Sequence, residues 1–168
     1  MQKHFSRKNL IFAILTVAVM VVIFIFSGQS AAQSSGISGS ITEKVIEIFV
    51  PDSSKLGSTE FQALFDSVHH LIRKCAHFCL FAALGFCGAM SVPAEALAEV
   101  KQGFVWKWLA VFVFGVVYAA LDELHQLWSM GRSCQLSDVA IDALGVLAGL
   151  VAAWLIERLI IFAKSKSR

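Results

Sequence analysis

The chain has 168 residues, of which 57% are hydrophobic and 15% are charged, and its mean hydropathy is +0.72. Soluble domains are usually about 45–50% apolar and about 25% charged. The composition therefore excludes a disordered chain and argues against a soluble one. The net charge of +2 is divided between the two ends and gives no basis for a nucleic-acid partner. We expect an integral membrane protein, with the lipid bilayer as its surroundings and one domain over residues 1–168.

Four apolar stretches are each long enough to cross a bilayer, and none alternates as a membrane strand does. They cover residues 10–26, 71–92, 104–127 and 138–161. This pattern predicts an all-α fold with four transmembrane helices. A cleaved secretion signal is the alternative for the first stretch, because small residues suited to cleavage follow it at 30–32.

Basic residues gather at both ends of the chain. Lys3, Arg7 and Lys8 precede the first stretch, and four more lysines and arginines follow Glu157. Cytoplasmic loops and tails carry an excess of such residues. An even number of spans places both tails on the same side, so we expect the N- and C-termini to be cytoplasmic.

This topology makes residues 28–70 an outer loop. Residues 28–40 are rich in Ser and Gly and are expected to be flexible. Residues 41–50 place apolar side chains at helical spacing, which predicts a short amphipathic helix on the outer surface. Residues 60–68 show the same spacing and form a second, separate helical segment.

In the same topology nearly all unusual polar residues of the four stretches fall in one layer at the outer leaflet. A charge at membrane depth costs roughly 2.5–3.5 kcal/mol on insertion scales, so such residues need partners and often mark function. Helical spacing places those of each stretch on shared faces. Interfacial salt bridges and snorkelling side chains are the alternative explanation. The expected site combines Ser27, Gln29, Arg73, Lys74, His77, Asp122, Glu123, His125, Gln126, Arg132, Asp138 and Asp142.

Asp142 lies one helical turn deeper than Asp138, beside residues suited to close packing. A carboxylate at that depth predicts a buried basic partner, either Arg73 or Arg132. Small residues at a four-residue spacing allow two helix backbones to approach closely. The glycines that would permit this approach are Gly85, Gly88, Gly145 and Gly149.

Three segments resemble the VanZ family of bacterial membrane proteins, which is named after a teicoplanin-resistance factor. They are FSGQ at 26–29, RKCAHFCLFAALG at 73–85 and YAALDELHQLWSMGRSCQLSDVAIDALGVLAG at 118–149. The order of DE-x-HQ, GR and D-xxx-D-xx-G in the third segment is the most specific part. The resemblance implies a multi-pass protein of the bacterial cytoplasmic membrane, acting on the cell envelope and linked to glycopeptide-antibiotic susceptibility.

The polar layer is compatible with a binding function. Arg73, Lys74 and Arg132 would bind a phosphate or carboxylate of a lipid or lipid-linked cell-wall-precursor headgroup. The four acids of the layer and Gln126 would orient these cations and accept hydrogen bonds. Besides the three cations, the predicted ligand-binding residues are Ser27, Gln29, Gln126, Asp138 and Asp142.

Two other functions stay open at this point. A hydrolase or transferase would use His77, Asp122, Glu123 and His125 as candidate acid and base catalysts. A structural or adaptor protein would use the polar layer only to hold its helices together, with protein partners that the sequence does not specify. No cofactor is expected. A divalent metal is a weaker alternative, because the spacing is not HExxH and no CxxC pair occurs.

Overall fold

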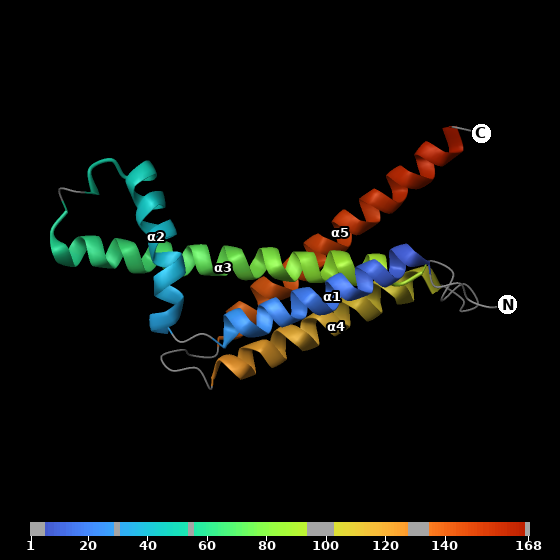
Figure 1. The fold of residues 1–168 in the computed structure, drawn as a ribbon, viewed down its shortest axis with the longest axis horizontal. Helices are drawn as coiled ribbons and strands as arrows, with labels where there is room; N and C mark the ends of the chain where they lie inside the picture. The colour runs from blue at the N-terminus through green and yellow to red at the C-terminus, as the bar shows by residue number, and fades with distance from the viewer. Residues whose placement is uncertain (1–5, 29–30, 54–55, 94–102, 128–134, 167–168) are drawn as a thin grey trace.

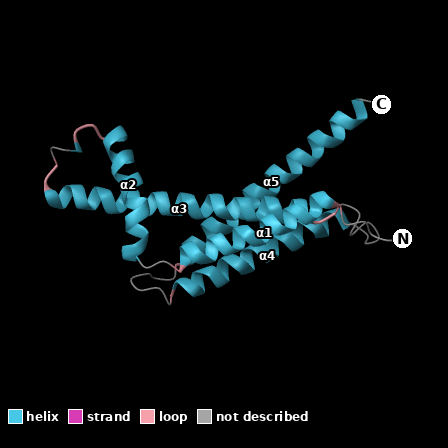
Figure 2. Cartoon of the chain, viewed as in Figure 1, coloured by secondary structure: helices cyan, strands magenta, loops and turns pink. Residues whose placement is uncertain are grey.

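The computed structural model describes residues 6–28, 31–53, 56–93, 103–127 and 135–166, and throughout these ranges the regular structure is helical (Figure 2). The helices are α1 (Arg7–Ser27), α2 (Ala31–Phe49), α3 (Ser58–Ser91), α4 (Gly103–Gln126) and α5 (Leu136–Lys166). Four of them, α1, α3, α4 and α5, are long and apolar enough to cross a membrane. The predicted all-α fold with four spanning helices is therefore confirmed.

The four long helices lie together as a bundle, and α2 crosses α3 outside it (Figure 1). α3 packs most extensively against α5, and these two helices run in the same direction. α1 and α4 run in the opposite direction, so α1 and α4 end where α5 begins. The C-terminal end of α5 projects from the bundle.

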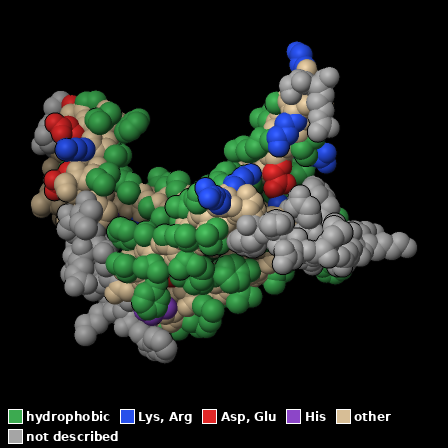
Figure 3. Space-filling view, turned by 45° about the vertical axis from the view of Figure 1, so that its right-hand side comes forward, with side chains coloured by type: hydrophobic (Ala, Val, Ile, Leu, Met, Phe, Trp, Pro, Cys, Tyr) green, Lys and Arg blue, Asp and Glu red, His purple; other side chains and the backbone are tan. Residues whose placement is uncertain are grey.

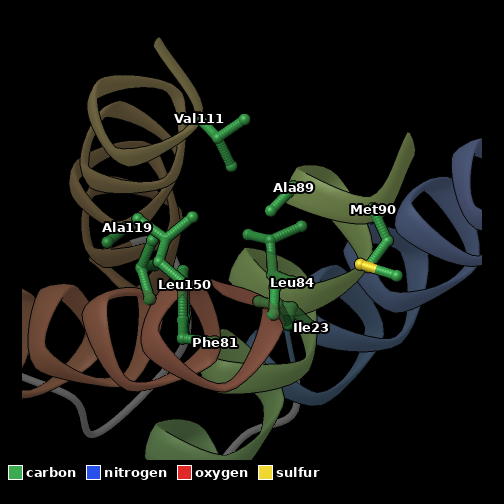
Figure 4. Packing of buried hydrophobic residues seen from close by; sticks show 10 residues of the cluster. Ile23, Phe81, Leu84, Ala89, Met90, Val111, Ala119 and Leu150 are labelled. Atoms are coloured by element: carbon green, nitrogen blue, oxygen red, sulfur yellow. The ribbon is translucent and has the colours of Figure 1, made fainter. Parts of the chain in front are cut away.

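The bundle is apolar on the inside and on most of its outside. Figure 3 shows hydrophobic side chains over its flank, with charged side chains gathered toward the projecting parts. Ile14 and Val17 of α1, for example, are 60% and 59% exposed. Such exposure suits a surface that faces lipid, where apolar side chains need no cover. The core between the helices (Figure 4) consists of Ile23, Phe81, Leu84, Ala89, Met90, Val111, Ala119, Val146, Leu150 and Ala153.

Glycines bring α3 and α5 into backbone contact. A Cβ atom at Gly149 would lie 2.7 Å from the backbone nitrogen of Phe86, closer than real Cβ atoms come to such an atom. Gly145 and Gly85 meet the backbone of the other helix in the same way, whereas Gly88 faces a side chain of α4. The close approach predicted from the glycine spacing is confirmed for the α3–α5 pair.

The region expected to be a flexible loop holds a helix. Residues 31–40 form the first half of α2, and the predicted amphipathic segment at 41–50 lies almost wholly within the second half. Thr42 and Ile46 are buried, with 0% and 1% of their surfaces exposed. α2 packs on α3, and this tertiary packing outweighs the low helix propensity of Ser and Gly.

α3 is longer than the span that the sequence predicts. It begins at Ser58 instead of residue 71, and the segment at 60–68 is continuous with the membrane span. Polar residues at 69–74 lower the local hydropathy, but no glycine or proline interrupts the helix before Gly85. Hydropathy indicates which residues suit the membrane and not where a helix begins, so the predicted start of this helix at residue 71 was wrong.

Candidate functional site

The polar residues of the spanning helices lie at the end of the bundle where α1 and α4 end and α5 begins. We call this group the polar end. The predicted residues Gln29 and Arg132 lie outside the described residues. The polar end contains Ser27 of α1, Arg73, Lys74 and His77 of α3, Asp122, Glu123, His125 and Gln126 of α4, and Asp138 and Asp142 of α5.

α3 and α5 meet at the polar end through two pairs of residues. Lys74 Nζ lies 2.8 Å from Asp138 Oδ1, and both side chains are partly exposed. One turn deeper, His77 Nδ1 lies 4.0 Å from Asp142 Oδ2. The two helices run in the same direction, so a step of one turn along α3 matches a step of one turn along α5.

Arg73, one of the two predicted partners of Asp142, does not pair with it, and the other, Arg132, lies outside the described residues. Within the described chain no arginine lies within ion-pair distance of Asp142, and the imidazole of His77 occupies that place. Arg73 lies a full turn nearer the helix start than His77, while Asp142 lies a turn deeper than Asp138. The register that joins Lys74 to Asp138 therefore brings His77, not Arg73, to Asp142.

Asp122 links α4 to α1 and α3. Its Oδ2 atom accepts a hydrogen bond of 2.7 Å from the Ser27 hydroxyl and one of 3.1 Å from Gln126 Nε2. His77 Nδ1 lies 4.0 Å from the same oxygen. Ser27, Asp122 and Gln126 are all buried. These contacts hold the carboxylate in one orientation beside the imidazole.

Glu123 and His125 point elsewhere. Glu123 Oε1 accepts a hydrogen bond of 2.7 Å from the backbone nitrogen of Gln135. The ring of His125 stacks on that of Phe24 in α1, with centroids 4.3 Å apart. Neither Phe24 nor Gln135 stands out in the sequence, although Phe24 is three residues before Ser27 and so shares its helix face. These two predicted catalytic residues do not line the cavity described next.

A small cavity opens between α3, α4 and α5 at the polar end. Its volume is about 20 Å³, and one water molecule needs about 10–15 Å³. The cavity therefore admits one water molecule or one ion, and a larger ligand would contact its mouth. It is lined by Arg73, Lys74, His77, Gln126, Asp138, Ile141 and Asp142.

Among the residues that the structure describes, the polar end offers ligands for ions more readily than a nucleophile for covalent catalysis. Ser27 is fully buried, and its hydroxyl donates to the carboxylate of Asp122. An activated serine instead donates to a base such as an imidazole, which removes its proton. The side chains of His77, Asp122 and Asp142 are all of types that bind metal ions.

Comparison with known proteins gives one match. The family model described as VanZ/LLP1 matches residues 12–157, which is nearly the whole chain. The matched range contains every residue of the polar end. No curated protein matches the chain, and neither does any solved structure.

Proposed function

The chain belongs to the VanZ/LLP1 family, and from this premise we propose that it binds an anionic headgroup at the outer face of the bacterial cytoplasmic membrane. The headgroup would be that of an envelope lipid or a lipid-linked cell-wall precursor, and the polar end would be the binding site. Occupation of this site would lower susceptibility to the glycopeptide antibiotic teicoplanin. The antibiotic effect rests on the resemblance to the family, and the binding site rests on the geometry.

The observation that carries the proposal is that Arg73 lines the cavity without an acidic partner among the described residues. Its side chain lines the cavity, and within the described residues no carboxylate lies within ion-pair distance of its guanidinium. The neighbouring Lys74 is different, since Asp138 pairs with it at 2.8 Å. A guanidinium carries five N–H donors in a planar fork that matches phosphate and carboxylate oxygens. Arg73 therefore has donors available for an anion.

The surroundings of the cavity suit a lipid-linked anion. The cavity itself is too small for a headgroup, so the anion would bind at the mouth beside Arg73. The same helices that line the mouth expose apolar side chains to the membrane, such as Leu71 and Leu144, which are 61% and 58% exposed. An acyl or polyprenyl chain would find apolar contact there while its headgroup stays at the polar end.

A test uses a teicoplanin-sensitive bacterial host that carries the wild-type chain or Arg73→Gln at matched membrane abundance. We expect the wild type to raise the inhibitory concentration of teicoplanin and Arg73→Gln to lose this protection. Binding of phosphatidylglycerol by the purified chain should weaken about tenfold, as loss of a charge-assisted hydrogen bond of about 1.5 kcal/mol predicts. The matched control is Arg158→Gln. Arg158 lies near the C-terminal end of α5, over the ring of Trp154 and away from the polar end.

Three outcomes would contradict parts of the proposal. Equal protection by the wild type and Arg73→Gln would show that the polar end is not the site. Equal losses in Arg73→Gln and Arg158→Gln would show a general effect of lost charge. No protection by the wild type would remove the antibiotic effect, and the lipid-binding measurement would then decide the rest.

A further inference from the structure

We propose that His77, Asp122 and Asp142 form a binding site for one divalent transition-metal ion. The three residues come from three different helices, α3, α4 and α5. One potential ligand atom of each residue lies within 4.8 Å of those of the other two. The proposal concerns the metal ion alone and does not depend on the headgroup site at Arg73.

The distances are suited to closure around an ion. His77 Nδ1 lies 4.0 Å from Oδ2 of Asp122 and 4.0 Å from Oδ2 of Asp142. Ligand atoms bonded to one Zn²⁺ at about 2.0–2.2 Å lie roughly 3.3 Å apart in a tetrahedral site. Movements of about 1 Å, within reach of small side-chain rotations, would therefore bring the three atoms to coordination distance.

Charge and burial favour a cation between the two aspartates. The side chains of Asp122 and Asp142 are only 2% and 4% exposed. Two carboxylates buried this close together need compensating positive charge whenever both are ionised. Buried charges are stable only when they are paired, hydrogen-bonded or bound to metal. A divalent cation would balance both carboxylates while His77 stays neutral, as a metal ligand must.

Among the described residues none donates a hydrogen bond to the carboxylate of Asp142. His77 Nδ1 lies 4.0 Å from its Oδ2 atom. The carboxylate lines the cavity of about 20 Å³ together with His77. The cavity thus presents a nitrogen and an oxygen ligand to a space that holds one ion or one water molecule.

The carboxylate of Asp122, the third ligand, is held in position by two hydrogen bonds. Ser27 and Gln126 both donate to Oδ2 of Asp122. Hydrogen bonds of this kind orient metal-binding carboxylates and raise metal affinity. Ser27 and Gln126 are therefore positioning residues, because they orient the carboxylate of Asp122.

The ligand set indicates the class of metal. One imidazole and two carboxylates suit Zn²⁺ or Mn²⁺ better than a purely oxygen-bound Mg²⁺ or Ca²⁺. Three protein ligands leave a coordination position that faces the cavity, as in zinc sites that also bind water or a ligand oxygen. An oxygen of a bound headgroup would be able to occupy that position if the proposed function is correct.

The test titrates the full-length chain, purified in detergent and treated with a chelator, with Zn²⁺ alone and with Mn²⁺ alone by calorimetry. We expect one ion per chain, and at least about tenfold weaker binding in both Asp142→Asn and His77→Gln. The matched control is Asp66→Asn. It makes the same chemical change on α3, at an exposed position outside the polar end, and should keep the wild-type affinity.

The proposal is overturned if the wild type binds neither ion, or if His77→Gln and Asp142→Asn bind as tightly as the wild type. It is also overturned if Asp66→Asn loses as much affinity as they do. If Asp142→Asn does not fold, His77→Gln decides alone, supported by the visible spectrum of the Co²⁺-loaded chain. Arg73→Gln removes a positive charge beside the cavity and should not weaken Zn²⁺ binding. Failure of Zn²⁺ and Mn²⁺ binding would therefore remove the metal site only, whereas unchanged teicoplanin protection by Arg73→Gln would remove the headgroup site only.

Discussion

The contact between α3 and α5 has two halves that are built in opposite ways. In the deep half, Gly85, Gly145 and Gly149 remove side chains from the contact, so that the two backbones touch. In the outer half, Lys74–Asp138 and His77–Asp142 fill the contact with polar side chains. Among the described residues, the deep half contains no Asp, Glu, His, Lys or Arg, and the outer half has no glycine that could bring the backbones together.

This difference shows how a simple packing motif serves a polar site. Backbone contact at the glycines sets both the separation and the register of the two helices. The same register continues into the outer half. Two side chains one turn apart on α3 therefore face two side chains one turn apart on α5. We conclude that the glycines hold His77 and Asp142 in place although they do not touch them.

The largest expected effect comes from breaking the deep half. Gly149→Leu places a side chain where Phe86 backbone nitrogen would lie 2.7 Å from its Cβ atom. Overpacking of this kind costs about 3 kcal/mol in the free energy of unfolding, which SDS titration of the detergent-solubilised chain measures. The control is Ala148→Leu, which adds the same side chain at an exposed position on α5. Equal stability of these two variants would show that the backbones are not in contact.

A smaller loss in the free energy of unfolding is expected from a substitution at the polar end. Ser27→Ala removes the hydroxyl that donates to Asp122 at 2.7 Å, and both groups are buried. Loss of this bond should lower the free energy of unfolding by about 1–2 kcal/mol in the same titration, because the carboxylate keeps only one of its two donors. Ser67→Ala is the control, since its exposed hydroxyl bonds only to a backbone carbonyl. A cost no greater than that of the control would mean that Ser27 does not position Asp122.

The smallest effect is expected away from both halves, at the opposite end of the bundle. Lys107 is 4% exposed and pairs with Glu157 at 2.7 Å. Lys107→Met leaves Glu157 without its cation, but the glutamate side chain is 24% exposed and water can solvate it. We expect a loss of about 1 kcal/mol, recovered in the double variant Lys107→Met/Glu157→Gln. Teicoplanin protection should be retained, and its loss would place function at this end too.

The spans and the polar residues could be predicted from the sequence because both depend on local composition. Long apolar stretches mark the four spanning helices, and ionisable residues within them stand out by their cost in a membrane. The helix over 31–40 could not be predicted in this way. Its residues favour a loop by themselves, and it is helical because α2 packs on α3, with the Ser38 hydroxyl 2.6 Å from the His69 ring.

The pairing within the polar end needed three-dimensional information. Helical spacing correctly places Asp122 and Gln126 on one face of α4, where they form a hydrogen bond. It does not show which turn of α3 lies opposite which turn of α5, and the predicted partners of Asp142 were chosen by charge alone. The same limit applies to His125, whose ring packs on Phe24 of α1 instead of lining the cavity.

The length of α3 has a mechanical consequence. The helix extends from Ser58 to Lys74 before it reaches the polar end, a distance of roughly 24 Å at 1.5 Å per residue. α2 packs on α3, and residues 58–74 of α3 contain no proline or glycine at which the helix could bend. This segment is a stiff, uninterrupted helix, and α3 is held against α5 at the glycine contact. A force applied to α2 outside the bundle would tilt α3 as a unit and shift His77 against Asp142.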